Sequence, residues 1–385
     1  MRIKLFLMLT ILFVFAVSAS AQGGPPPMPD LGEGVVIAEG LNGPQGLYVD
    51  SEGSVYVIDS GLGGEETTEF FNPNTGEIVP STYGNTTRIV KISMDGEQEV
   101  IAMLPSVAVG EGEDFIGGAR LTESDGTLYA TVGAWIIGQG EEVTVPFYSQ
   151  VVAITDGEAE TVADLWAFEL ENNPDETINV ESHPYGITAG PDGMLYVTEA
   201  AGNALVSVDP ESGEVTLVAA FDPLPGVFPN PLRNNELLAD PVPTNVAFDD
   251  EGNLFVSLLS GAPFVPGTAK VVQVSEDGEV TDFATGLTML TDLKLGPDGN
   301  LYATSFNVFA QEGPVFNSGS VIRILEDGTA EVVVAGLPFV TAVAFDADGN
   351  GYVAINGAAI PGIGMVVRYD GLTEMEGQPL PEMGA

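Results

Sequence analysis

A short motif that recurs along the chain constrains its fold more than any other feature. In the copy at residues 190–197 (GPDGMLYV), an acidic residue and a glycine precede an apolar run, and an aromatic follows three residues after the glycine. This pattern predicts a hairpin turn, because glycine accepts a positive φ and the carboxylate can bond the nearby backbone. We find six copies, with the glycine and aromatic pairs Gly53 and Tyr56, Gly126 and Tyr129, Gly193 and Tyr196, Gly252 and Phe255, Gly299 and Tyr302, and Gly349 and Tyr352.

A second hairpin follows each copy of the motif. Its first strand is rich in Val and Ile and leads to another turn that contains glycine; the six strands are residues 88–92, 150–154, 204–208, 270–274, 320–324 and 365–369. Each unit therefore supplies four strands, which is the number in one blade of a β-propeller. Six units in series predict an all-β fold, a six-bladed β-propeller of four-stranded blades.

The last unit lacks a convincing fourth strand, because the chain becomes polar and Pro-rich after Gly371. Residues 35–38 (VVIA), with Gly-Leu at residues 40–41, closely match residues 332–335 (VVVA), with Gly-Leu at residues 336–337. We therefore expect the N-terminal strand to complete the C-terminal blade, which closes the ring and removes an exposed sheet edge. The expected propeller spans residues 34–372, and residues 373–385 are expected to form a flexible tail.

The first 21 residues have the pattern of a secretory signal peptide. A basic start at Arg2 and Lys4 precedes an apolar run at residues 5–17 and a small-residue cleavage site at residues 19–21. Residues 22–33 form a Pro/Gly-rich linker. The chain has no cysteine, which excludes a disulfide framework and thiolate metal ligands. We expect a secreted or periplasmic protein without membrane insertion.

The net charge of −46 arises from 56 acidic and 10 basic residues. Such a surface repels phosphate backbones and anionic headgroups, so we expect no nucleic-acid partner. We expect a monomer kept soluble by its charge. Five basic residues lie on the same repeated strand and are expected to pair with nearby acids: Arg88, Lys91, Lys270, Arg323 and Arg368.

The starts of the six inner strands should surround the mouth of a central channel. Aligned as residues 44–47, 117–120, 184–187, 243–246, 290–293 and 340–343, they give a third column of Gly46, Ala119, Gly186, Asn245, Asp292 and Ala342. Small side chains suit a crowded axis, whereas Asn245 and Asp292 could instead coordinate a cation. The candidate ligand-binding residues at this mouth are Gln45, Arg120, His183, Tyr185, Asn245 and Asp292.

Two functions remain open. The first is a non-catalytic binding or scaffold module for a small molecule, glycan or protein, on the face that carries the insertions at residues 61–87, 170–184 and 221–243. The second is a Ca²⁺-assisted hydrolase or lyase in which Asn245 and Asp292 hold the metal. His183 is the only histidine, and no Gly-x-Ser-x-Gly motif occurs, so no catalytic set is assembled in the sequence.

Several segments, some of them in the insertions, resemble the ScyD/ScyE family, exported proteins associated with scytonemin biosynthesis. They are residues 163–165 (ADL), 172–175 (NNPD), 183–186 (HPYG), 243–247 (PTNVA), 259–264 (LSGAPF) and 286–293. The resemblance implies a six-bladed propeller of the NHL, TolB-like or gluconolactonase-like type, but no catalytic residues. Calcium-dependent lactonases of this wider group hold their metal with acids near the inner strands. Here the second column offers no carboxylate.

Overall fold

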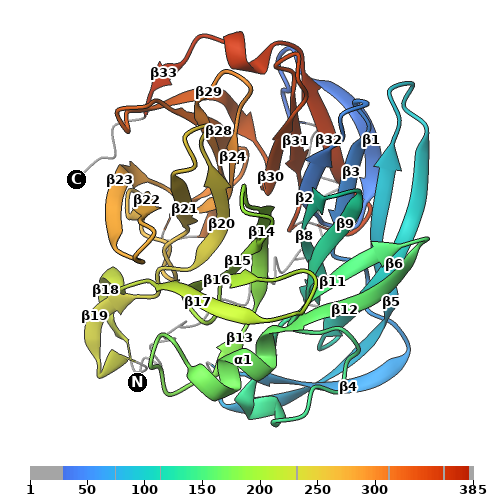
Figure 1. Ribbon diagram of the computed structural model, residues 1–385, viewed down its shortest axis with the longest axis vertical. Coiled ribbons are helices and arrows are strands. Elements are labelled where there is room, and N and C mark those ends of the chain that lie inside the picture. The colour runs from blue at the N-terminus through green and yellow to red at the C-terminus, as the bar shows by residue number, and fades with distance from the viewer. Residues whose placement is uncertain are drawn as a thin grey trace, which may run out of the picture.

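The computed structural model describes residues 29–380, apart from residues 74, 113, 231–232, 311–312 and 359. The expected signal peptide and most of the linker lie outside the described residues. In the described part the chain is mostly β, as predicted (Figure 1). Its helices are short and include η1 (Ile137–Gln139), α1 (Leu165–Asn172) and η3 (Leu372–Glu374).

Six large sheets follow one another along the described part of the chain, and the first strands of these sheets lie toward the middle of Figure 1. The first sheet contains β2 (Pro44–Val49), β3 (Val55–Asp59), β4 (Glu66–Asn72), β5 (Glu77–Ile92), β6 (Gln98–Val109) and β7 (Asp114–Ile116). The second contains β8 (Gly118–Ser124), β9 (Thr127–Val132), β11 (Gln150–Thr155) and β12 (Glu158–Asp164). The third contains β14 (Pro184–Ala189), β15 (Leu195–Glu199), β16 (Ala204–Val208) and β17 (Val215–Ala220).

The other three sheets repeat this order. The fourth contains β20 (Pro243–Phe248), β21 (Leu254–Leu258), β22 (Ala269–Val274) and β23 (Val280–Leu287). The fifth contains β24 (Leu290–Leu295), β25 (Leu301–Ser305), β28 (Gly319–Ile324), β29 (Ala330–Leu337) and β33 (Gln378–Pro379). The sixth contains β30 (Ala342–Phe345), β31 (Gly351–Ile355), β32 (Gly364–Tyr369) and β1 (Val35–Leu41). Three two-stranded ribbons pair β10 (Trp135–Ile136) with β13 (Glu181–Ser182), β18 (Leu224–Asn230) with β19 (Glu236–Ala239), and β26 (Val308–Ala310) with β27 (Gly313–Val315).

The inner strands contact one another in chain order. Strand β2 contacts β8, β8 contacts β14, and the series continues through β20, β24 and β30, which contacts β2 again. Strand β1 pairs antiparallel with β32, with Val36 opposite Val367. This is the pairing expected from the sequence for residues 35–38, and it places β1 in one sheet with three strands of the last unit.

The repeated glycines form the turns that the sequence predicts. All six have positive φ, from 80° at Gly126 to 85° at Gly252. In the last copy, Asp346 Oδ1 accepts hydrogen bonds from the backbone N–H groups of Asp348 and Asn350, and the hydroxyl of Tyr352 donates to Asp346 Oδ2. Tyr56 makes the equivalent bond to Asp50, whereas Tyr196 and Tyr302 donate to Asp192 and Asp298, the aspartates that precede the turn glycine. The motif is therefore a locally bonded turn.

The alternation of strands gives the ring two unlike sides. We call the side with the repeated glycine turns the turn side. The opposite side, where the inner strands begin, we call the loop side. Its connections contain the predicted insertions, which form the β4–β5 hairpin, helix α1 and the β18–β19 ribbon.

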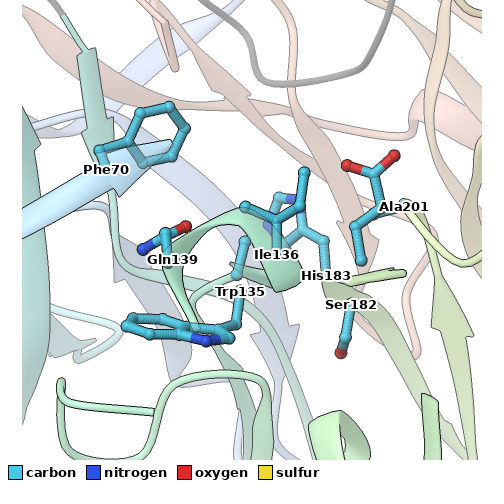
Figure 2. Close-up of a pocket in the computed structure, with 9 residues that line it drawn as sticks. Phe70, Trp135, Ile136, Gln139, Ser182, His183 and Ala201 are labelled. Atoms are coloured by element: carbon cyan, nitrogen blue, oxygen red, sulfur yellow. The ribbon is translucent and has the colours of Figure 1, made fainter. Parts of the chain in front are cut away.

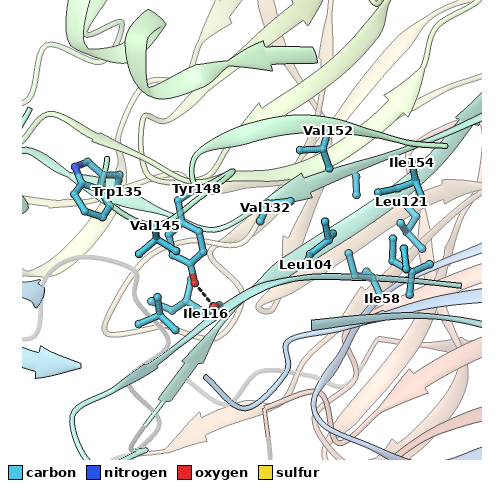
Figure 3. Close-up of a cluster of buried hydrophobic side chains, with 14 of the residues drawn as sticks. Ile58, Leu104, Ile116, Leu121, Val132, Trp135, Val145, Tyr148, Val152 and Ile154 are labelled. Atoms are coloured by element: carbon cyan, nitrogen blue, oxygen red, sulfur yellow. Dashed lines mark hydrogen bonds between the residues drawn. The ribbon is translucent and has the colours of Figure 1, made fainter. Parts of the chain in front are cut away.

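Apolar side chains between adjacent sheets form the core. Figure 3 shows one such cluster, in which Ile58 and Leu104 of the first sheet lie near Leu121 and Val152 of the second. All four side chains are almost completely buried. Within this cluster the hydroxyl of Tyr148 donates to the carbonyl of Ile116, so the phenol oxygen of this buried side chain also has a hydrogen-bond partner.

The C-terminal segment differs from its expected form. The sequence predicts a flexible tail over residues 373–385, but β33 pairs with β29, and Arg323 Nη1 donates to the carbonyl of Thr373 at 3.0 Å. Leu372, just before this segment, is fully buried. The segment therefore packs on the fifth sheet as far as residue 380, since backbone pairing and one apolar anchor are available to it.

All five repeated basic residues pair with acids, as predicted. Arg88 pairs with Asp59, Lys91 with Asp50, Lys270 with Asp282, Arg323 with Glu331 and Arg368 with Asp370. Most of these pairs are partly exposed, so each contributes ~0–1 kcal/mol.

Candidate functional site

The register of β8 differs from the sequence alignment by one residue. Tyr129 lies opposite Thr122, whereas Tyr56 of the first sheet lies opposite Tyr48. Counting back from these pairs places Arg120, rather than Ala119, at the same level as Gly46. The corrected column that faces the axis is Gly46, Arg120, Gly186, Asn245, Asp292 and Ala342. The shift arises because the β8–β9 turn is one residue shorter than the others: Arg120 precedes the turn glycine Gly126 by six residues, whereas Gly46 precedes Gly53 by seven.

Arg120 is fully buried at the centre of the ring. Its Nη1 donates to the carbonyls of Gln45 and Ala119, and its Nη2 donates to those of Thr291 and Thr341. The guanidinium carbon lies 4.5 Å from the ring centre of Tyr185, in a cation–π contact. One arginine thus links four of the inner strands through its donors and its stacking.

Asp292 balances this charge. Its Oδ1 lies 3.6 Å from Arg120 Nε and accepts hydrogen bonds from Asn245 Nδ2 at 2.5 Å and the backbone N–H of Leu293 at 2.9 Å. Its Oδ2 accepts from the backbone N–H of Val343 at 3.0 Å. Both carboxylate oxygens are therefore already engaged by groups of the protein.

The structure brings together all six residues predicted to lie at the channel mouth. Besides the contacts of Arg120, Asn245 and Asp292, the hydroxyl of Tyr185 donates to Gln45 Oε1 at 3.0 Å. The ring of His183 lies edge-on to Tyr185, with ring centres 5.5 Å apart. We call Gln45, Arg120, Tyr185, Asn245 and Asp292 the axial cluster. Its members bond mainly to one another and to the inner strands.

Threonines tie the inner strands together beside the axial cluster. The hydroxyls of Thr244, Thr291 and Thr341 donate to the carbonyl of the next inner strand, at 3.0, 2.9 and 2.6 Å. These threonines stand in the second column of the inner-strand alignment, which offers no carboxylate. That column thus has a structural role here.

A metal role for Asn245 and Asp292 stays a prediction. Among the described residues, no three His, Asp or Glu side chains stand close enough to one another to hold a metal ion between them. Asp292 is the one acid of the axial cluster, and hard divalent cations prefer several charged oxygens.

A small pocket lies on the loop side, between the second and third sheets (Figure 2). Phe70, Trp135, Ile136 and Gln139 line it together with Glu181, Ser182 and His183. Its water-accessible volume is about 10 Å³, which is room for roughly one water molecule. Of these residues, the sequence analysis singled out only His183.

Next to this pocket lies a group of buried acids that no sequence motif predicts. Its members, which we call the acid cluster, come from two connections and a strand end on the loop side: Glu169, Asp175, Glu181, Glu199 and Asp240. Arg233 is the basic residue that pairs within the cluster, with Asp240 at 2.9 Å and Asp175 at 3.4 Å.

The pKa values of the acid cluster reflect its shortage of positive charge, since Arg233 is the basic residue that pairs within it. Burial, together with the charges of Glu199, Asp175 and Glu181, raises the pKa of Glu169 to about 9. Burial raises the pKa of Glu199 to about 8, although Ser182 Oγ and the backbone N–H of His183 donate to its carboxylate. Burial and the charges of Asp240 and Asp175 also raise the pKa of Glu181. These groups favour either a proton or another cation.

None of the helices in the described part of the chain is long and apolar enough to cross a membrane.

Comparisons with known proteins identify the fold and no family. A scan of protein-family models and a search of curated proteins give no match. Among solved structures, the putative oxidoreductase (glucose dehydrogenase) of Thermus thermophilus matches with a TM-score of 0.50 and 18% identity, over 87% of this chain and 98% of that one. The PQQ-bound aldose sugar dehydrogenase of Streptomyces coelicolor matches with a TM-score of 0.50 and 15% identity, over 89% and 99%. A gluconolactonase of Xanthomonas campestris has a TM-score of 0.45 and 12% identity, over 88% and 99%. At these identities the likeness shows a β-propeller fold alone.

Proposed function

We propose that this chain is an exported, six-bladed β-propeller that acts as a non-catalytic binding module, with its partner on the loop side. The pairing of β1 with β32 supports ring closure and the count of six blades. The resemblance of residues 243–247 and 259–264 to the ScyD/ScyE family supports membership of that family and export.

The distribution of exposed apolar side chains carries this proposal. The described residues leave sixteen large hydrophobic side chains exposed, and ten of them belong to connections on the loop side. These ten are Leu62, Ile78, Leu170, Ile178, Val227, Phe228, Leu237, Val315, Phe316 and Ile360. The turn side exposes one, Met94. Exposed apolar side chains gathered on one side are typical of an interaction surface.

The expected partner is a protein with a basic surface. On the loop side, the pocket holds about 10 Å³ of water-accessible space, far less than the roughly 300 Å³ of a small-molecule site; a larger hollow of about 280 Å³ lies on the turn side, beside Tyr48 and Glu123. Apolar side chains on projecting ribbons suit a broad contact with another chain. The net charge of −46 favours and steers a partner of opposite charge.

A displayed library of random peptides, used beside a glycan array, tests this proposal. The wild-type protein should enrich peptides that combine basic and apolar residues. The triple variant V227S/F228S/L237S should lose this enrichment. A matched control, V100S/M103S/L217S, removes equally exposed side chains from outer strands and should retain it.

Equal enrichment by both triple variants would move the binding surface away from the loop side. Binding to the glycan array alone would replace the protein partner with a sugar.

Ring closure has its own test, based on truncation of the N-terminus. A chain that starts at Gly40 loses most of β1 and exposes the edge of β32, which should cost several kcal/mol at ~1 kcal/mol per lost hydrogen bond plus lost burial. A chain that starts at Leu31 keeps β1 and should be as stable as the full mature chain. Equal unfolding midpoints in urea for the two truncations would contradict closure through β1.

A further inference from the structure

Three buried glutamates lack a counter-charge among the described residues. The exposed fractions of Glu169, Glu199 and Glu181 are 1%, 1% and 7%. None of them forms an ion pair with a described basic residue, and Arg233 is already shared by Asp175 and Asp240. Buried carboxylates are normally paired or bound to a metal, because an isolated buried charge is very costly.

The equivalent strand end in the first sheet shows how a buried acid is usually paired with a cation. Asp59 ends β3 as Glu199 ends β15, and Asp59 is also fully buried. Arg88, which lies opposite Asp59, forms a salt bridge with it at 2.5 Å. The residue opposite Glu199 is Ala204, which has no charge to offer. The third sheet thus keeps the buried acid and lacks its cation.

Two side chains at the C-terminal end of helix α1 have buried oxygens without a hydrogen-bond partner. Neither carboxylate oxygen of Glu169 has a hydrogen-bond partner, and the buried Oδ1 of Asn173 also lacks one. Asn173 follows Glu169 by one helical turn, and its backbone N–H bonds the carbonyl of Glu169 at 2.8 Å. The carboxylate of Glu169 lies against the turn after Glu199, since a Cβ placed on Gly202 would be 2.7 Å from Oε2.

We propose that Glu169, Asn173 and Glu199 bind a divalent cation between α1 and the turn that joins β15 to β16. All the available donors are oxygens, in an irregular arrangement from different elements, which suits Ca²⁺ better than the strict octahedron of Mg²⁺. The acids do not already converge as a group of three, so the amide oxygen of Asn173 and water complete the shell, as Ca²⁺ accepts. This site lies away from the axial cluster, and it does not depend on the proposed partner.

Terbium luminescence provides a direct test with Tb³⁺ as the probe for a calcium site. The chain has two tryptophans, and both lie near the proposed ion. Trp166 precedes Glu169 by three residues in α1, and Trp135 lines the pocket beside Glu181. Excitation of tryptophan in the full mature protein should therefore produce saturable Tb³⁺ emission that added Ca²⁺ suppresses.

Matched variants locate the ion. In E169Q the Tb³⁺ affinity should fall about tenfold or more, since one charged ligand is lost. E171Q makes the same change on the exposed part of α1 and should bind as the wild type does. The thermal midpoint of the wild type should rise with Ca²⁺, and that of E169Q should not.

Three results would overturn the proposal. They are the absence of saturable emission from the wild type, equal affinity in E169Q and E171Q, and loss of binding in D292N with retention in E169Q. The last result would place the ion at the axial cluster instead.

Discussion

The axial cluster and the acid cluster solve the same problem in opposite ways. Both bury charged side chains on or near the inner strands. In the axial cluster, Arg120 and Asp292 face each other, and the buried side-chain atoms without a hydrogen-bond partner are Arg120 Nε and Asn245 Oδ1. In the acid cluster, five carboxylates share one arginine, and both oxygens of Glu169 are without a partner.

The axial cluster is therefore a structural centre, whereas the acid cluster is a region that responds to protons and cations. A buried network with matched charges is fixed in one arrangement and holds the inner strands in place. A buried cluster with excess charge changes its energy with every proton or cation that it gains. We therefore expect substitutions in the axial cluster to affect stability under all conditions. Substitutions in the acid cluster should act in a way that depends on pH and on metal ions.

Breaking the axial cluster should have the largest effect. In R120M the side chain keeps its bulk, but Asp292 remains buried without its cation, and four carbonyls lose a donor. Loss of one partner of a buried pair typically costs about 3–5 kcal/mol. The free energy of unfolding in urea measures this loss. The double variant R120M/D292N should recover part of the loss, because it removes the unpaired charge. A loss under about 1 kcal/mol in R120M would contradict the role assigned to Arg120.

Neutralising the acid cluster should have an intermediate effect of opposite sign. The pKa of Glu169 is raised from 4.5 to about 9, so between these values the folded protein holds a proton that the unfolded chain has released. Stability in a buffer with chelator should therefore fall as pH rises through this window. E169Q removes the free-energy cost of burying this ionisable carboxyl group. The variant should be more stable than the wild type at pH 8 by at least about 1 kcal/mol.

Urea unfolding at several pH values measures the effect of E169Q, with E171Q as the exposed control. The pH profile of E169Q should be flatter than that of the wild type. Identical profiles for E169Q, E171Q and the wild type would mean that Glu169 is not buried as an uncompensated acid.

The two clusters also differ in how well the sequence predicts them. The residues of the axial cluster occupy aligned positions in the repeat, so comparison of the six units is enough to bring Asn245 and Asp292 together. The alignment fails at Arg120 because the β8–β9 turn is one residue shorter than its five counterparts, which shifts the register by one residue. Gly117 and Gly118 stand in place of the usual first residues, so an alignment of the strand starts alone does not show this shift.

The acid cluster has no comparable sequence signal. Glu169 lies in α1, Glu181 in a two-residue strand and Glu199 at the end of β15. They meet because the connection between the second and third sheets folds back over the loop side, which is a long-range event. The insertion at residues 170–184 marks the region, but the count of acids along this very acidic chain does not distinguish buried carboxylates from solvated ones.

The smallest expected effect concerns His183, which lies between the two clusters. Its backbone N–H donates to Glu199 Oε2 at 2.7 Å, while its ring contacts Tyr185 of the axial cluster. Burial and the positive charge of Arg120 lower its pKa from 6.5 to about 4. The folded protein therefore binds fewer protons than the unfolded chain between these values, and the contribution of His183 to stability rises with pH there.

NMR titration of this single histidine tests which cluster controls its ring. The ring signals should stay constant from pH 8 to about 5 and shift only below that. E171Q should leave the titration unchanged, since Glu171 lies on the exposed part of α1. A midpoint at or above 6.5 would show that the acid cluster dominates and carries more negative charge at neutral pH than its raised pKa values indicate. The opposite pH dependence of His183 and Glu169 makes the two contributions separable in one set of unfolding curves.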